Sequence, residues 1–204
     1  FCELFVYLHS LDWKPFVRNS LAYKGPEPYV TIDRWLELVE RHINDFKADE
    51  YTPILNWLKE HRIEVPHEKP SVIHFDYHPY NIILRDDGKA FVIDWTSMEV
   101  ADYRIDLAWT ILLTSTYGHS EARDIVLSNY ERIAGREVQQ IEYFEVAASV
   151  RRLFSILLSI RDGAAKFGMR PQAVEMMKRN VNHIKNVYAF MADRTGINIP
   201  RIEA

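Results

Sequence analysis

The spacing of the apolar residues changes after residue 70 of this 204-residue chain, and the change limits the folds open to it. Residues 71–74, 82–85 and 90–93 are short runs rich in β-branched side chains, which is typical of strands. The last two runs are separated by Asp-Asp-Gly-Lys at 86–89, a sequence that favours a tight turn. We therefore expect these two runs to pair as a β-hairpin.

Most of the remaining chain has the spacing of amphipathic helices. The expected helices cover residues 1–11, 31–46, 53–61, 105–117, 120–134, 138–167 and 171–194. Residues 15–28 are expected to form a loop, because they end in the breaker sequence Gly-Pro-Glu-Pro. The predicted fold class is α+β and mostly helical. No linker or repeat divides the chain, so residues 1–204 form a single unit in which 105–194 make a helical subdomain.

Composition excludes several classes of protein. Lys and Arg number 25 and Asp and Glu number 29, so the net charge of −4 leaves no basic excess for binding nucleic acid. The longest uncharged stretch, 107–120, is shorter than the roughly 20 apolar residues that cross a bilayer, so no membrane segment is expected. The single cysteine, Cys2, cannot form an internal disulfide, which fits a reducing compartment and predicts a cytoplasmic location.

The residues that could carry chemistry lie in the strand region. The segment 74–81 reads His-Phe-Asp-Tyr-His-Pro-Tyr-Asn, and its proline argues against a continuous helix, so we expect a loop. A hairpin after this loop would bring Asp94 back beside Asn81. Asp76, Asn81 and Asp94 would then surround a common point with two carboxylates and one amide. Hard oxygen ligands of this kind, few in number, suit Mg²⁺.

This segment resembles the catalytic loop of the kinase superfamily, in which H-x-D-x-x-x-x-N is followed by a metal-binding aspartate. With Ile-Asp-Trp at 93–95, it resembles the aminoglycoside phosphotransferase (APH) and choline-kinase-like branch, whose typical pattern is H-G-D-x-H-x-x-N and then I-D-W/F. Residues 101–108, Ala-Asp-Tyr-Arg-Ile-Asp-Leu-Ala, are similar to the G-D-P-x-x-D-L-A segment of that branch. Leu-His-Ser-Leu at 8–11 is similar to the L-H-S-L helix that follows its interlobe hinge.

The resemblance implies a small-molecule kinase that transfers the γ-phosphoryl group of ATP or GTP to an acceptor hydroxyl. It implies that Asp76 accepts or orients the proton of that hydroxyl. Asn81 and Asp94 would bind the cofactor by holding Mg²⁺ against the nucleotide phosphates. Too few residues separate Trp95 from Asp102 for the activation segment of a protein kinase. The expected acceptor is therefore a small molecule such as an aminoglycoside, a choline-like compound or a sugar.

The resemblance also gives supporting roles to three residues around Asp76. His74 would act with Asp76 in catalysis by setting the shape of the loop. Asp106, near the start of a predicted helix, would brace the loop through hydrogen bonds to its backbone. His78 is assigned to structural support of the loop, without a defined contact.

The sequence contains no recognisable nucleotide-binding lobe. Its seven glycines are not arranged as G-x-G-x-x-G, and nothing precedes the Leu-His-Ser-Leu helix that could supply a strand lysine. We therefore interpret residues 1–204 as the carboxyl-terminal lobe alone, inactive by itself and cut from a longer polypeptide. Within it, residues 71–94 hold the catalytic loop and the metal-binding hairpin. The face left by the absent lobe would be apolar and exposed, and we expect it to favour self-association.

Two other interpretations stay open. A non-catalytic binding or regulatory module would explain the missing lobe and two departures from the family pattern. These are Phe75, where glycine is usual, and Tyr80, where a small residue is common. A metal-dependent hydrolase could instead use His74, Asp76 and His78 as an H-x-D-x-H site for zinc or iron, since imidazole suits these metals.

The charge of the acceptor is also open. An acidic excess between residues 27 and 68 could attract a cationic acceptor. Arginines in the second half of the chain could instead suit an anionic or neutral acceptor; these are Arg151, Arg152, Arg161 and Arg170. The tryptophans at helical spacing are expected to be core residues rather than ligand platforms; these are Trp35, Trp57 and Trp109.

Overall fold

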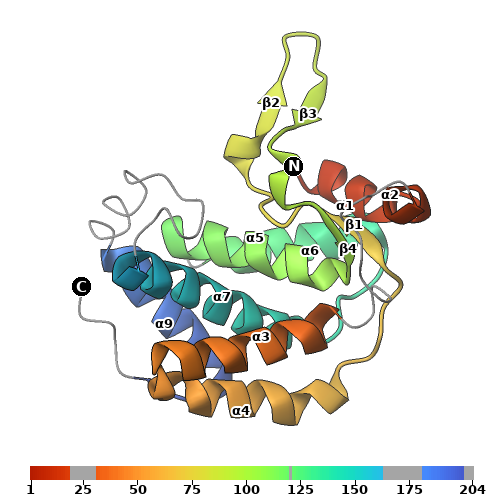
Figure 1. The fold of residues 1–204 in the computed structure, drawn as a ribbon. Helices are drawn as coiled ribbons and strands as arrows, with labels where there is room; N and C mark the ends of the chain where they lie inside the picture. The colour runs from red at the N-terminus through yellow and green to blue at the C-terminus, as the bar shows by residue number, and fades with distance from the viewer. Residues whose placement is uncertain (19–30, 120, 163–180, 200–204) are drawn as a thin grey trace.

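The computed structural model describes residues 1–18, 31–119, 121–162 and 181–199, and most of these residues are helical (Figure 1). The helices are α1 (Cys2–Ser10), α2 (Lys14–Arg18), α3 (Thr31–Phe46), α4 (Thr52–His61), α5 (Tyr103–Tyr117), α6 (Ala122–Ala134), α7 (Ile141–Asp162) and α9 (Val181–Thr195). The strands are β1 (Ser71–Ile73), β2 (Ile82–Leu84), β3 (Ala90–Val92) and β4 (Glu99–Ala101). The predicted α+β, mostly helical fold class is therefore confirmed.

The element boundaries agree closely with the expected ones, and one expectation was wrong. Helix α2 forms at the start of the segment predicted as a loop, because a proline is tolerated in the first turn of a helix. The rest of that segment, 19–30, lies outside the described residues, as do the parts of the last two predicted helices that fall in 163–180. Among the described helices, none is long and apolar enough to span a membrane.

The four strands form two separate two-stranded sheets, β1–β4 and β2–β3. Strands β2 and β3 form the predicted hairpin, with Ile82 opposite Val92. Gly88 permits its tight turn by adopting a φ of 80°, which a residue with a Cβ rarely does. Strand β4, which the sequence did not predict, pairs antiparallel with β1 and places Ala101 opposite Ser71. The β1–β4 pair is packed against α1 and α5, whereas the hairpin projects from the helical body (Figure 1).

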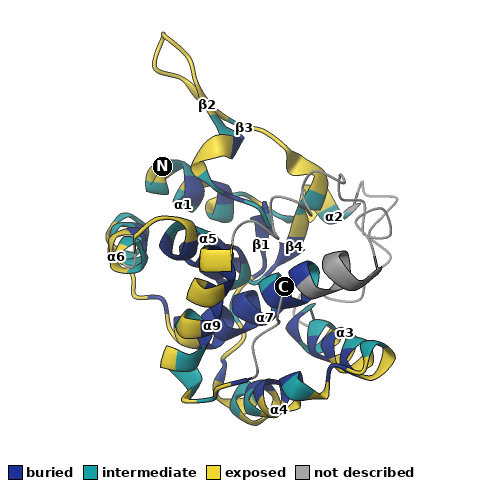
Figure 2. Cartoon of the chain, turned by 90° about the vertical axis from the view of Figure 1, so that its left-hand side faces the viewer, coloured by how far each residue is buried: buried dark blue, intermediate teal, exposed yellow. Residues whose placement is uncertain are grey.

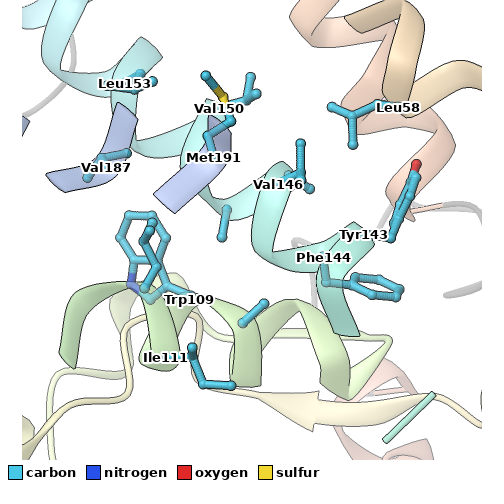
Figure 3. Close-up of a cluster of buried hydrophobic side chains, with 14 of the residues drawn as sticks. Leu58, Trp109, Ile111, Tyr143, Phe144, Val146, Val150, Leu153, Val187 and Met191 are labelled. Carbon is cyan, nitrogen blue, oxygen red and sulfur yellow. The ribbon is translucent and has the colours of Figure 1, made fainter. Parts of the chain in front are cut away.

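The core lies between the helices, and α5 and α7 are its central pair. Helix α9 packs against both of them, α4 packs on α7, α6 packs on α5, and α1 packs on α6 and β1. Figure 3 shows the side chains that fill the space between α4, α5, α7 and α9. Fully buried members of this group are Leu58, Ile111, Val146, Leu153, Val187 and Met191. Figure 2 shows the contrast between these buried helix faces and the exposed hairpin.

Leu58 tests this packing, because its side chain is 0% exposed where α4 meets α7. Leu58→Ala leaves a cavity in the core and is expected to lower the free energy of unfolding by about 2–5 kcal/mol. Urea denaturation followed by circular dichroism measures this loss. The control is Leu84→Ala on the hairpin, where the leucine is 74% exposed. A similar loss in both variants would contradict the described core.

A buried histidine joins the end of α5, the middle of α7 and the start of α9. His183 is 2% exposed, and its ring stacks on the ring of Tyr117 with the centroids 3.7 Å apart. Its Nε2 atom accepts a hydrogen bond from Arg152 Nε at 2.9 Å. Burial, together with the positive charge of Arg152, lowers the pKa of His183 to about 3. The histidine is therefore neutral in the folded protein at ordinary pH.

This histidine should make folding pH-dependent. Because the folded protein holds His183 neutral while the unfolded chain protonates it near pH 6.5, the free energy of unfolding should fall as the pH drops from about 6.5 towards 3. His183→Gln should reduce the slope of stability against pH in this range. Urea denaturation at several pH values measures the slope, with His119→Gln on the exposed surface as the control. An unchanged slope in His183→Gln would contradict the assignment.

Candidate active site

The site is built on the first turns of helix α5. Asp102 caps this helix by accepting a hydrogen bond from the Arg104 backbone N–H at 3.0 Å. The fully buried Arg104 also binds the Asp102 carboxylate and the backbone oxygens of Pro66 and Gln139. These contacts fix the start of α5 directly after β4. Because β4 pairs with β1, the first turns of α5 lie beside the loop that leaves β1.

Asp106, in the first turn of α5, holds the start of that loop. Its carboxylate is 0% exposed and accepts hydrogen bonds from the backbone N–H groups of His74 at 2.7 Å and Phe75 at 2.9 Å. His9 Nε2 on α1 lies 3.3 Å from the same carboxylate, and His9 Nδ1 lies 2.7 Å from the hydroxyl of Tyr130 on α6. Asp106 therefore joins the loop to α5 and α1, and through His9 to α6.

Asp76 follows this anchored dipeptide and stays open to solvent. Its side chain is 41% exposed, and Oδ1 accepts a hydrogen bond from the indole N–H of Trp109 at 3.1 Å. Oδ2 lies 3.6 Å from Nε2 of His78. Partial burial favours the protonated form, but the contacts with His78 and Trp109 and the charge of Arg151 outweigh it and lower the pKa of Asp76. The result is an ionised, oriented carboxylate that a substrate can reach.

The second half of the loop is held by Asn81 and by α5. Nδ2 of Asn81 donates to the carbonyl oxygen of Asp76 at 2.9 Å and lies 3.3 Å from Nε2 of His78. The hydroxyl of Thr110 on α5 donates to the carbonyl oxygen of Tyr77 at 2.7 Å. The loop is therefore closed on itself and tied to the helix, which fixes the Asp76 backbone on both sides.

The base of the hairpin lies beside the end of the loop. The Ile93 N–H donates to the Asn81 carbonyl at 2.9 Å, so Asp94 comes one residue after the pairing partner of Asn81. Nε2 of the buried His74 donates to the Ile93 carbonyl at 2.8 Å. Asp94 is exposed and adopts a left-handed backbone with φ 61°, and its Oδ1 accepts from the hydroxyl of Thr96 at 2.8 Å. The structure thus brings Asp94 to the end of the hairpin that carries Asn81.

The described contacts of His74 differ from those of a metal ligand or of a group that meets substrate. Its ring is 0% exposed and bonds the hairpin backbone, and no contact with Asp76 is present among its described interactions. In the part of the chain that the structure describes, no three His, Cys, Asp or Glu residues are grouped to hold a metal ion. The structure therefore gives no support to an H-x-D-x-H site made of His74, Asp76 and His78.

The contacts of Trp109, Thr110 and His9 around the loop were missed from the sequence. Trp109 is buried, as predicted for a core residue, but its indole also donates to Asp76. Thr110 binds the loop backbone, and His9 contacts Asp106. The signal for two of them was present, because Trp109 and Thr110 follow Asp106 by three and four residues, so all three share one face of α5.

Comparison with known proteins agrees with this arrangement. Residues 4–144 match the sequence profile of the Phosphotransferase enzyme family (APH). The chain belongs to this family. Among solved structures it is similar to an ethanolamine kinase from Plasmodium vivax, with a TM-score of 0.53 and 11% sequence identity, over 93% of this chain and 59% of that one. This likeness shows a shared fold, and the chain spans 59% of the length of that kinase. No curated protein matches the chain.

The predicted resemblance to the APH and choline-kinase-like branch is therefore confirmed at the level of family and fold. The match spans the loop 74–81, Asp94 and Asp106, which are the positions on which the resemblance was recognised.

The contacts of Asp106 lead to a stability prediction. Asp106→Ala leaves two buried backbone N–H groups without acceptors, at about 1–3 kcal/mol each, so the free energy of unfolding should fall by about 2–5 kcal/mol. Chemical denaturation measures the loss. Asp124→Ala is the matched control, because Asp124 is also an acid in the first turn of a helix but is 81% exposed. Equal stability of the two variants would contradict the described role of Asp106.

Proposed function

We propose that this chain carries the catalytic part of a small-molecule kinase, which moves the γ-phosphoryl group of ATP or GTP to an acceptor hydroxyl. The observation that carries the proposal is the ionised and partly exposed carboxylate of Asp76, oriented by Trp109. Such a carboxylate can accept the proton of an alcohol and aim its oxygen at the phosphorus atom. The anchoring of the loop by Asp106 and His74 supports this use of Asp76.

Asn81 and Asp94 are proposed to hold Mg²⁺. Because Asn81 uses Nδ2 for its contacts with the loop, its Oδ1 is left without a hydrogen bond among the described residues. Asp94 accepts from Thr96 through Oδ1, and within the described chain Oδ2 has no such partner. One amide and one carboxylate oxygen, completed by water and phosphate oxygens, fit a hard cation. Bound there, Mg²⁺ would neutralise the charge that develops on the phosphates.

We propose that the hairpin packs against the rest of the nucleotide site. Large apolar side chains are exposed along it and beside it; these are Tyr80, Ile83, Leu84, Phe91, Ile93 and Trp95. A nucleotide-binding lobe packed around the hairpin would cover them, and in the isolated chain a second copy could do so. We therefore propose that the chain alone has little activity and self-associates. A cytoplasmic location is proposed separately, from the single cysteine.

For the acceptor, we propose an amino alcohol as the first class to test, because the structural neighbour is named as an ethanolamine kinase. Arg151 is not available as a simple anion-binding group, since its guanidinium contacts Phe75 and Trp109. Choline, sugars and aminoglycosides complete the panel, because the family model describes phosphotransferases without fixing one acceptor.

A non-catalytic binding module is the second candidate, and one observation favours it. Phe75, directly before Asp76, has a left-handed backbone with φ 64°, in a position where the family pattern has glycine. A module that no longer turns over substrate would tolerate such a change. It would bind nucleotide or acceptor without transferring phosphate.

Substitution of the two acids separates these candidates. With the chain assayed alone and joined to any coding sequence that precedes it, nucleotide consumption is measured against the acceptor panel. Asp76→Asn should lower kcat by about 10²–10⁴-fold, because the positioned proton acceptor is lost. Asp94→Asn should raise the Mg²⁺ concentration needed for half-maximal activity, because a ligand oxygen is lost.

The matched control is Asp86→Asn, an exposed acid at the tip of the same hairpin, which should leave both values unchanged. Activity that persists in Asp76→Asn at the unmodified rate would remove Asp76 from the reaction. Binding of nucleotide or acceptor without any phosphate transfer would favour the non-catalytic module.

A further inference from the structure

Arg151 lies in the middle of helix α7. It contacts Phe75, which precedes Asp76 in the chain, and Trp109, which donates a hydrogen bond to the Asp76 carboxylate. Its guanidinium carbon lies 3.6 Å from the ring centre of Phe75 and 4.0 Å from the ring centre of Trp109. Its Nη1 donates to the backbone carbonyl of Phe75 at 3.3 Å. Arg151 lies beyond residues 4–144, which match the family profile, so the match does not assign it a role.

The backbone that Arg151 contacts is in an unusual conformation. Phe75 has φ 64°, and a bulky residue is rarely found in this left-handed region because its Cβ crowds the backbone. Two hydrogen bonds hold the residue there, since its N–H donates to Asp106 and its carbonyl accepts from Arg151. The cation–π contact between the ring and the guanidinium adds a third attachment. Phe75 therefore keeps a conformation that glycine would adopt without support.

Trp109 links Arg151 to the carboxylate of Asp76, because it contacts both groups. One face of its ring contacts the guanidinium, and its N–H donates to Asp76 Oδ1 at 3.1 Å. The position of the indole thus depends on Arg151, and the position of the Asp76 carboxylate depends on the indole. Charge acts in the same direction, because the positive charge of Arg151 favours the ionised form of Asp76.

The surroundings keep Arg151 charged. Burial lowers the pKa of Arg151 to about 10, and the nearby carboxylates of Asp76, Asp106 and Glu99 oppose this effect. The neighbouring charge of Arg152 acts with burial. A pKa of about 10 leaves the guanidinium positive at neutral pH.

We propose that Arg151 is a positioning residue for Asp76: its guanidinium, in contact with Phe75 and Trp109, holds the left-handed backbone before Asp76 and the indole that orients its carboxylate. The catalytic consequence of this role rests on the proposed kinase function. The structural part does not, because it concerns the conformation of a loop, which can be measured without substrate.

The test measures by NMR how fast the indole N–H of Trp109 exchanges its hydrogen with solvent at neutral pH, in the 204-residue chain. Trp109→Phe assigns the signal. Arg151→Met removes the charge and the planar group, and the indole N–H should then exchange about tenfold faster, because the ring loses the guanidinium that holds it beside Asp76. The matched control is Arg152→Met, the adjacent arginine, which contacts Tyr117 and His183 and should leave this exchange rate unchanged.

Arg151→Lys gives a second test, which decides the question should Arg151→Met fail to fold. It keeps the charge but loses the planar contact with the two rings. The His74 and Phe75 amides should then exchange their hydrogens about tenfold faster, because the loop is less firmly held. Phe75→Gly combined with Arg151→Lys should remove most of this acceleration at His74, since glycine adopts a positive φ without support.

In a folded Arg151→Met variant, an unchanged exchange rate of the Trp109 indole N–H would overturn the proposal. An unchanged exchange rate in Arg151→Lys would also overturn it. Once an acceptor is identified, Arg151→Met should lower kcat more than it changes KM for the acceptor, as expected for a residue that acts through Asp76. Lack of phosphate transfer in the unmodified protein would instead reject the kinase function, and the two NMR results would still decide the role of Arg151.

Discussion

The buried carboxylate of Asp106 is the interaction on which the arrangement of the loop depends. An ionised acid is costly to remove from water unless donors replace its hydration. Here the donors are the backbone N–H groups of His74 and Phe75, with His9 beside them. Because these partners come from distant parts of the chain, the acid can be buried only when α1, α5 and the end of β1 have all assembled. The loop is therefore held in its described position only when these elements have packed together.

Helix α5 serves both the core and the site. One face presents Asp106, Trp109 and Thr110 to the loop, while Leu107 and Ile111 are fully buried. Helices α7 and α9 pack against this same helix. A change in core packing that rotates α5 would therefore move the groups that orient Asp76. This coupling explains how a loop between two strands can hold a carboxylate in a fixed position.

The structural features that could be predicted from the sequence are those that depend on the local pattern of residues. The hairpin, most helices and the segment 74–81 were recognisable because their signals lie within a few neighbouring residues. Strand β4 was missed, since three residues containing Glu99 give no alternation to detect. The contact of His9 with Asp106 and the contacts of Arg151 with the loop could not be predicted either. They depend on how α1 and α7 pack, and single-sequence periodicity gives the apolar face of a helix but not its crossing angle or its neighbours.

Asp76 and Asp94 take their positions from different parts of the molecule. Asp76 is attached through Trp109 to the helical body, whereas Asp94 is carried by the arm formed by β2 and β3 (Figure 1). The base of this arm is fastened at Ile93, whose N–H donates to the Asn81 carbonyl and whose carbonyl accepts from His74. The separation of the two carboxylates therefore depends on backbone hydrogen bonds that neither carboxylate makes itself.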